Sequence, residues 1–388
     1  MQVLGLAFFL TFAVFSQDTT SARSIIDSLS SKQMWGRGYT QNGHVIAANY
    51  IADKFEKIGL EKYSSLNSYF QYFSFEVNVI KNCEVKSKKK LILGIDYLPS
   101  ASIPSVNQTF KVLKDSISYK SSKNCFFLNS NKKNNFNNLY TSKSKLTHTF
   151  SQHQSNNFDL NITENAQEKI GRKLKLNINS ELQSVTSQNV IGYISGTEYR
   201  DSLLIFCAHY DHLGGIGESC YFPGANDNAS GIAMLLQIAE YYKKNPIKYS
   251  VLIIAFGAEE VGLIGSKYFV FNPICDLKTI KLVTNLDLMG SGKEGVTIVN
   301  GSIYNHVFDV FKQVNESHNL LKIVKPRGKA ANSDHYFFSE KGVPAIFIYS
   351  LGEITAYHDI NDTSKVVTLS KYNEMFKLIT YSISKLYK

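Results

Sequence analysis

The chain has 388 residues, of which 44% are hydrophobic and 19% charged, a composition typical of a globular protein with a substantial core. Its formal net charge of +10 could suit nucleic acid. However, the lysines are scattered through loops rich in Ser and Asn, and no basic helix or aromatic-basic motif accompanies them. We therefore expect a solvated basic surface and no nucleic-acid partner.

The N-terminus contains an apolar stretch from Val3 to Phe15 that turns polar at Ser16. This stretch is too short to span a bilayer, but it suits the core of a signal peptide. A buried N-terminal strand is the alternative, because no Lys or Arg lies near Met1. We expect residues 1–16 to be a signal peptide, and an exported, soluble protein in the periplasm or the medium. No later apolar run is long enough for a membrane span.

The first predicted helix covers residues 44–60, "HVIAANYIADKFEKIGL". Helical spacing places four apolar residues on one face, and a glycine ends the pattern. These residues are Ala48, Ile51, Phe55, Ile58 and Gly59.

Residues 73–184 have a looser pattern, and much of this stretch is rich in Asn, Ser and Lys. We interpret it as a polar surface insertion with a few weak strands, within one domain that covers residues 17–388. The insertion contains Cys83 and Cys125, which could form a disulfide in an oxidising compartment, although the sequence leaves the pairing open. Cys207, in the apolar run "LLIFCA", is expected in the core.

From Asn189 onward, short apolar runs alternate with helical patterns. This alternation predicts an α/β domain with a mostly parallel sheet, buried on both faces. Sheets of this kind place their functional sites beyond the carboxyl ends of the strands. The predicted strands cover residues 189–196, 202–208, 249–256, 280–288 and 343–350, and the helices cover 230–244, 304–319 and 370–388.

Acidic residues and histidines follow these strands in five segments. Each has an ordinary explanation as a loop residue, a helix start or a solvated pair, but five such placements together indicate one site. The candidates are His209, Asp211 and His212 in "AHYDHLG", Asp227 in "GANDNASG", Glu259 and Glu260 after "VLIIAF", Asp287 after "KLVTN", and His358 in "AYHDINDT".

Nitrogen and carboxylate ligands without thiolates suit catalytic zinc, which keeps a position open for water. Two zinc ions about 3.5–4 Å apart need a bridging carboxylate and a hydroxide between them. We expect Asp227 to be this bridge. The first ion would take His209, Asp227 and Asp287, and the second would take Asp227, Glu260 and His358.

Of the three candidates that then remain, Asp211, His212 and Glu259, two suit roles other than metal binding. Asp211 follows His209 by two residues, so its carboxylate can accept the second imidazole N–H and fix the tautomer. Glu259 is left beside the bridging hydroxide, where it can act as the general base.

These motifs, with "SDHYFFSEKGVPA" and "MWGRGYTQNGHVIAANYIADKFEKIGL", resemble metallopeptidase family twenty-eight, the secreted bacterial di-zinc aminopeptidases. The resemblance covers the chain from about Asn189 to its end, together with the N-terminal segment. It implies a phosphorylase/hydrolase-like α/β/α sandwich, the ligand and base roles given above, and peptide substrates with a free N-terminus.

The chain departs from this family in two places. Many relatives carry a protease-associated domain where residues 73–184 lie, and a full domain of that type is not expected in so polar an insertion. Some members have a tyrosine three residues before "SDH", where this chain has Ala330. Tyr336 or His335 could replace it as the group that stabilises the oxyanion.

Three other functions compete with an aminopeptidase. A glutaminyl cyclase of similar fold usually works with one zinc, whereas His209 and Asp287 complete a second metal set. A carboxypeptidase would need a basic residue for the substrate carboxylate, and Arg327 is the nearby candidate. A non-catalytic receptor-like module would have lost ligands or the base, and all of them are present.

Overall fold

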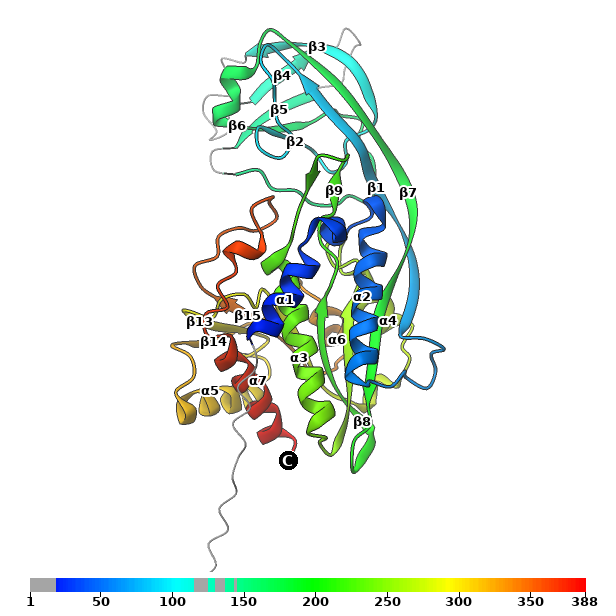
Figure 1. Ribbon diagram of the computed structural model, residues 1–388, viewed down its shortest axis with the longest axis vertical. Helices are drawn as coiled ribbons and strands as arrows, with labels where there is room; N and C mark the ends of the chain where they lie inside the picture. The colour runs from blue at the N-terminus through cyan, green and yellow to red at the C-terminus, as the bar shows by residue number, and fades with distance from the viewer. Residues whose placement is uncertain (1–18, 115–124, 130–136, 143–144) are drawn as a thin grey trace, which may run out of the picture.

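The computed structural model describes the backbone of residues 19–114, 125–129, 137–142 and 145–388. Side chains are described for residues 19–112 and 145–388. The predicted signal peptide lies outside the described residues. Figure 1 shows an elongated molecule, with a main domain that contains most of the helices and a smaller subdomain built of strands. Among the described residues, no helix combines the length and the apolar character needed to cross a membrane.

The sheet of the main domain has the strand order β14-β13-β15-β12-β8-β11-β7. Its four central strands run parallel to one another, and β7 and β13 are antiparallel to their neighbours β11 and β15. This confirms the predicted mostly parallel sheet. The strands are β7 (Lys173–Ile194), β8 (Tyr199–His209), β11 (Tyr249–Phe256), β12 (Ile280–Asp287), β13 (Gly295–Val299), β14 (Val324–Arg327) and β15 (Ala345–Leu351).

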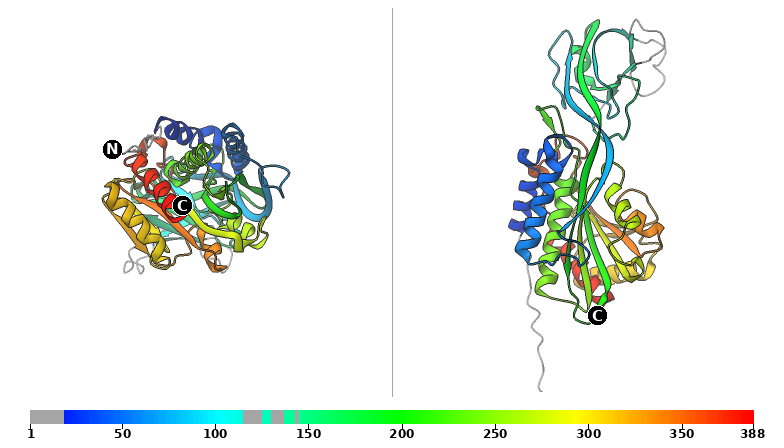
Figure 2. Two further views of the ribbon diagram at one scale, coloured as in Figure 1. Left: turned by 90° about the horizontal axis from the view of Figure 1, so that it is seen from below. Right: turned by 90° about the vertical axis from the view of Figure 1, so that its right-hand side faces the viewer.

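Helices cover both faces of this sheet. Successive residues of β8 point to opposite faces, and each set packs against a different group of helices. Phe206 packs in one core with α1, α2, α3, α5 and α7, whereas Cys207 packs in a second core with α4 and α6. The result is the predicted α/β/α sandwich (Figure 2). The helices are α1 (Thr19–Leu29), α2 (Gly43–Ile58), α3 (Ser230–Lys244), α4 (Ile264–Phe271), α5 (Asn305–His318), α6 (His335–Glu340) and α7 (Tyr372–Leu386).

Helix α2 begins and ends close to the predicted bounds. Ala48, Ile51 and Phe55 are buried, whereas Ile58 is only partly buried. Gly59 ends the helix in the left-handed conformation, with φ 82°, which a residue without a Cβ adopts at little cost. The remaining short elements are η1 (Lys32–Arg37), η2 (Thr40–Asn42), η4 (Glu164–Lys169), η5 (Ala225–Ala229), η6 (Leu277–Thr279), η7 (Ser364–Val366), β9 (Gly215–Ile216) and β10 (Cys220–Tyr221).

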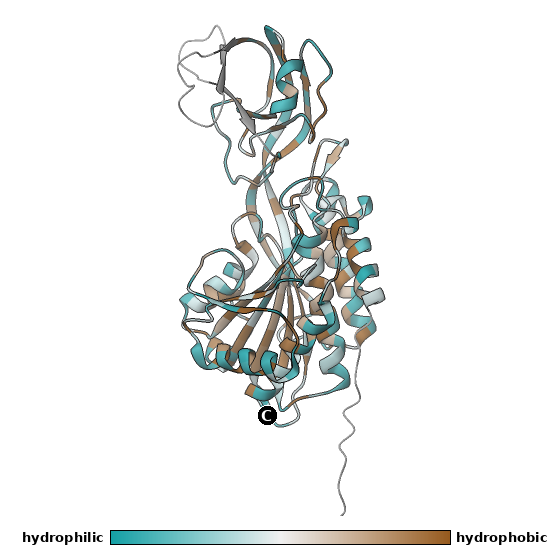
Figure 3. Cartoon of the chain, turned by 90° about the vertical axis from the view of Figure 1, so that its left-hand side faces the viewer, coloured by the Kyte–Doolittle hydropathy of each residue, from teal (hydrophilic) through white to brown (hydrophobic). Residues whose placement is uncertain are grey.

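The structure of the predicted insertion differs from the few weak strands expected there, because two of its strands are long and paired. Strand β1 (Phe70–Lys86) pairs with β7 as a long antiparallel ribbon, which continues from the main sheet into a β-subdomain (Figures 1 and 3). Both predicted insertion bounds, 73 and 184, therefore fall inside strands. The other strands are β2 (Tyr97–Pro99), β3 (Val106–Lys114), β4 (Cys125–Asn129), β5 (Asn137–Ser142) and β6 (Leu160–Thr163).

The β-subdomain is built around an apolar core distinct from the two cores that flank the main sheet. Phe110, Leu160 and Leu174 are fully buried in it. The same core includes Phe222 of the main domain, so the two parts pack together. Cys83 is a buried free cysteine, and the side chain of Cys125, the disulfide partner considered for it, lies outside the described residues.

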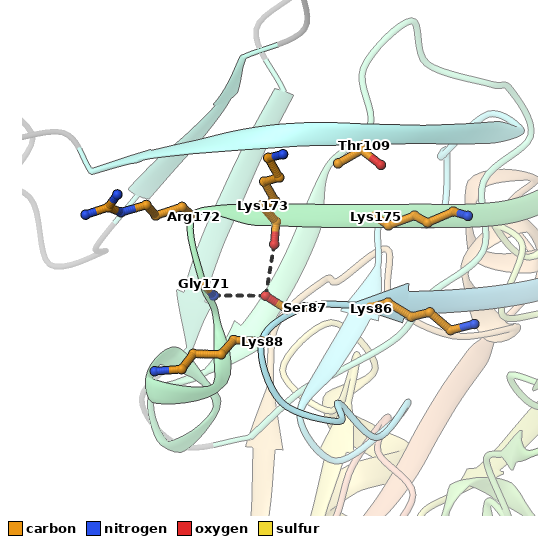
Figure 4. Close-up of a pocket in the computed structure, with 8 residues that line it drawn as sticks. All are labelled: Lys86, Ser87, Lys88, Thr109, Gly171, Arg172, Lys173 and Lys175. Atoms are coloured by element: carbon orange, nitrogen blue, oxygen red, sulfur yellow. Dashed lines mark hydrogen bonds between the residues drawn. The ribbon is translucent and has the colours of Figure 1, made fainter.

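One outer face of the β-subdomain is basic. Lys86 of β1 lies opposite Lys175 of β7 in the ladder, while Leu174 and Leu176 point into the core. This face carries an open pocket of about 480 Å³ (Figure 4). Part of the chain's positive charge is thus gathered here, as a solvated surface. The pocket is lined by Lys86, Ser87, Lys88, Thr109, Gly171, Arg172, Lys173 and Lys175.

Candidate metal centre

The candidate residues meet at the carboxyl ends of the parallel strands. His209 is the last residue of β8 and Asp287 the last of β12, while Glu259 and Glu260 follow the end of β11. Because these strands are parallel neighbours, their ends lie at one edge of the sheet. Asp227 reaches the same edge from η5, before α3, and His358 reaches it from the loop after β15.

Asp227 lies between the two histidines. Its Oδ1 is 3.4 Å from His209 Nε2, which is also 3.5 Å from Asp287 Oδ1. Its Oδ2 is 3.2 Å from His358 Nε2, which is also 3.2 Å from Glu260 Oε2. Each carboxylate oxygen of Asp227 therefore faces one of the two ligand sets expected from the sequence.

The donor set fits metal ions. His209, Asp227 and Glu260 have ligand atoms within 4.8 Å of one another, and so do His209, Glu259 and Asp287. Buried carboxylates at such distances repel one another unless a cation is shared among them. Asp287 Oδ1 is buried and has no hydrogen-bond partner among the described residues, as expected for an atom that binds a metal. Nitrogen and oxygen ligands of this kind suit zinc.

Glu259 and Glu260 have opposite electrostatic environments. Burial, reinforced by the charges of Glu260 and Asp334, raises the pKa of Glu259 well above its usual value despite His209. For Glu260, His358 and His212 outweigh burial and lower the pKa to about 2. Adjacent carboxylates with diverging pKa values are typical of a division between proton transfer and charge stabilisation.

The structure corrects the contact expected for Asp211. His209 Nδ1 is 3.1 Å from the backbone oxygen of Asp211 but 4.0 Å from its carboxylate. The carboxylate instead accepts the backbone N–H groups of Glu259, at 3.0 Å, and Glu260, at 3.3 Å. Asp211 thus holds the turn that carries both glutamates, and its backbone fixes the imidazole.

Two further polar residues support the candidate ligands. His212 Nδ1 donates to Glu260 Oε1 at 2.7 Å, although the sequence indicated no role for it. Asp362 accepts the backbone N–H groups of Asn226 and Asp227, at 2.9 and 3.0 Å. Both residues lie within the quoted motifs, and their position beside the ligands was the signal available from the sequence.

Arg37 was not singled out from the sequence, although it belongs to the N-terminal segment "MWGRGY". Its side chain is fully buried, and within the described part of the chain it donates to five backbone oxygens. Burial lowers the pKa of its guanidinium to about 10, so it remains charged near neutral pH. Arg37 joins the loops that carry the ligands. The accepting oxygens belong to Leu29, Tyr210, Pro223, Gly224 and Asp227.

The structure adds a candidate to those considered for the oxyanion. Tyr357 stacks on the ring of His358, with centroids 4.0 Å apart. Although the Tyr357 side chain is 48% exposed, partial desolvation and the nearby carboxylates, led by Asp227, raise the pKa of its phenol, so the hydroxyl keeps its proton. His335 is instead buried in α6 against Phe347, and Tyr336 is partly buried.

Solved structures of known proteins share this fold. A zinc aminopeptidase from Bacillus subtilis, BSAP, superposes with a TM-score of 0.69 over 96% of this chain and 95% of its own, at 20% identity. An aminopeptidase from Aneurinibacillus sp. strain AM-1 gives 0.65 over 95% and 94%, at 19% identity.

Sequence comparison identifies relatives among curated proteins and one family. Aminopeptidase YwaD of Bacillus subtilis is 30% identical over 51% of this chain and 44% of its own length. A glutamate carboxypeptidase 2 homolog of Caenorhabditis elegans is 32% identical over 45% and 23%. The chain thus spans less than half the length of these relatives. The model of peptidase family M28 matches residues 189–383, which is half of the chain and includes all of the candidate ligands. The chain therefore belongs to peptidase family M28.

Proposed function

We propose that the protein is an aminopeptidase that uses two zinc ions per chain to hydrolyse N-terminal residues from peptides. The observation that carries this proposal is Asp227, whose two carboxylate oxygens each face a different histidine at 3.4 and 3.2 Å. Family membership and the names of the relatives from Bacillus subtilis support zinc and amino-terminal cleavage.

The five ligands divide into two sets that share Asp227. His209 and Asp287 would complete the first set, and Glu260 and His358 the second. When bound, the zinc ions lower the pKa of water and polarise the substrate carbonyl. The protein holds these ligands through the contacts of Asp211, His212 and Asp362, which orient side chain or backbone around them.

Glu259 is the proposed general base. It takes a proton from the attacking water and later gives it to the leaving amine, so the enzyme ends with the proton count that it began with. Its raised pKa suits a group that must hold this proton between the two steps. We assign stabilisation of the oxyanion to the Tyr357 hydroxyl, because the Tyr357 ring stacks on that of His358 and its phenol has a raised pKa.

A carboxypeptidase is the second candidate, because one relative bears that name. It would need a cation to bind the substrate carboxylate. Arg37 is buried and donates to backbone oxygens, and Arg327 is exposed on the edge strand β14. Strands β13, β15 and β12 separate β14 from β8 and His209. Neither arginine is placed for this role.

A substrate panel tests the proposal. We expect hydrolysis of aminoacyl-p-nitroanilides, no hydrolysis of the same compounds with a blocked amino group, and no cyclisation of an N-terminal glutamine substrate. Zinc should be measured in the same preparation, with two ions per chain expected. Cyclisation with one zinc ion per chain would favour the glutaminyl cyclase. Cleavage of N-blocked peptides from the carboxyl end would favour the carboxypeptidase, and the absence of turnover with every substrate would favour the receptor-like module.

We also propose that the protein is exported and that its mature form begins near Gln17. The apolar stretch before Ser16 supports this. N-terminal sequencing of the protein recovered from outside the cytoplasm should find Gln17 or a neighbouring residue first. Recovery of the protein only inside cells, with Met1 retained, would contradict export.

A further inference from the structure

Residues 145–152, which we call the strap, link the β-subdomain to the metal centre. They lie in the chain between β5 and β6, and this connection runs between the two parts of the molecule (Figure 1). Leu146 is buried in the core of the β-subdomain. Phe150 packs on Tyr39 of the main domain, with ring centroids 4.9 Å apart. The strap is therefore anchored at both sides.

The first half of the strap holds the loop that carries His358. Lys145 Nζ donates to the backbone oxygens of Thr355, at 3.0 Å, and Tyr357, at 2.9 Å. The same ammonium lies 3.0 Å from the buried carboxylate of Asp359. The backbone N–H of His148 donates to the backbone oxygen of His358 itself, at 2.9 Å. The strap thus contacts the residues before His358, the residue after it and the backbone of His358 itself.

His358 needs such support because its backbone is in the left-handed region, with φ 55°. Residues with a Cβ adopt this region only when their surroundings hold them there. The contacts of Lys145 and His148 come from another part of the chain, so they constrain the loop independently of its own local hydrogen bonds.

The second half of the strap reaches the turn that carries the glutamates. Gln152 Nε2 donates to the backbone oxygen of Val261 at 2.8 Å, directly after Glu260. Glu260 and His358 are the two ligands that the second zinc ion would not share with the first. Contacts from one segment therefore converge on the two loops that complete one of the two metal sites.

We propose that the strap positions His358 and Glu260, and that Lys145 is a positioning residue for the zinc ion held by Asp227, Glu260 and His358. This inference rests on the proposed two-zinc site. It gives the β-subdomain a role in the reaction, because the subdomain supplies the segment that fixes one metal ligand.

Lys169 provides a matched control for Lys145. Its Nζ pairs with the buried carboxylate of Asp96 at 2.7 Å, and the lysine side chain is 32% exposed against 34% for Lys145. Both pairs therefore join a partly exposed lysine to a buried aspartate within or beside the β-subdomain. Lys169 lies in η4, and its ion pair is with Asp96, whereas that of Lys145 is with Asp359, next to His358.

The experiment is a calorimetric zinc titration of the metal-free full-length protein and its variants. Lys145→Met should weaken one of the two ions about 10-fold, the low end of the range for residues that support metal ligands. That ion should be the one lost in His358→Ala. Lys169→Met should leave both affinities at the wild-type values, while unfolding temperatures show how far each variant is destabilised.

A double variant guards against nonspecific effects. Asp359→Asn should weaken the same ion, but less than Lys145→Met does, because it breaks the ion pair and leaves the bonds of Lys145 to Thr355 and Tyr357. The double variant Lys145→Met/Asp359→Asn should weaken the ion no further than Lys145→Met alone, because Lys145→Met already breaks the ion pair. If Lys145→Met does not fold, Asp359→Asn carries the test. Wild-type zinc affinity in the folded Lys145→Met or Asp359→Asn variant, or an equal loss in Lys169→Met, would overturn the inference. A wild-type protein that binds fewer than two zinc ions would instead overturn the proposed function.

Discussion

Glu259 and Glu260 are neighbours in the chain, yet the pKa of the Glu259 carboxyl is raised and that of the Glu260 carboxyl is lowered. The difference arises because His212 and His358 approach Glu260, whereas burial dominates the environment of Glu259. This contrast separates the two proposed roles, and each role predicts a different response to the same isosteric substitution.

Glu259→Gln should abolish turnover while the zinc content stays that of the wild type. The amide keeps the shape of the side chain but cannot take or give the proton, and such groups contribute about 10²–10⁴-fold to the rate. Turnover of an aminoacyl-p-nitroanilide and zinc content are to be measured on the same sample. The assigned role is wrong if the variant loses zinc or keeps more than about a tenth of wild-type turnover, set against that range.

Glu260→Gln should lower zinc affinity, with activity partly recovered at high zinc concentration. A neutral amide is a poorer donor to a dication than a carboxylate, and the substitution also removes the charge that faces His212 and His358. A zinc titration followed by turnover measures the effect. Zinc affinity equal to that of the wild type would exclude Glu260 as a ligand.

At the scale of elements, α4 fixes the turn that carries both glutamates. Gly265, at the start of α4, donates its backbone N–H to the oxygen of Gly257 at 3.1 Å. A Cβ on Gly265 would lie only 2.1 Å from that oxygen. The close approach of helix and strand end therefore requires a residue without a side chain.

Gly265→Ala should destabilise the protein by about 1–3 kcal/mol, the range for overpacking in a closely packed interior. Gly328→Ala is the control, because a Cβ there would meet only Ser302 Oγ, at 3.7 Å, and its effect should stay within about 0.5 kcal/mol. Urea unfolding measures both free energies. Equal stabilities of the two variants would show that α4 shifts without cost.

The elements that the sequence predicted are those with strong apolar periodicity, such as α2 and the buried strands β8, β11 and β12. The ribbon of β1 and β7 was not predicted as such, because only one of its faces is buried and its other face carries Lys, Asn and Ser. The candidate ligands could be predicted because strand ends meet in parallel sheets. The contacts of Asp211 and Arg37 could not, since they depend on the positions of backbone atoms.

For the molecule as a whole, the metal centre should be a source of stability. Removing zinc leaves buried carboxylates close together, whereas a ligand that binds only the folded state stabilises it by about 2.7 kcal/mol at 100 times its dissociation constant. We expect chelator-treated protein to unfold at a lower temperature, and zinc to restore the temperature with saturation at two equivalents. Thermal unfolding monitored by circular dichroism measures this. Restoration complete at one equivalent would contradict the shared site.

Because the long ribbon of β1 and β7 connects the β-subdomain to the main sheet, we expect that the subdomain can be replaced by another. The chain leaves the main sheet on β1 and returns on its hydrogen-bonded partner β7, so Val77 and Gln183 lie opposite each other in the ladder. A two-residue Asn-Gly turn could join strands at such a point without changing their register. Grafting a different subdomain here should leave the sheet of the main domain intact. Every graft would need its own equivalent of residues 145–152 to keep the loop around His358 in place.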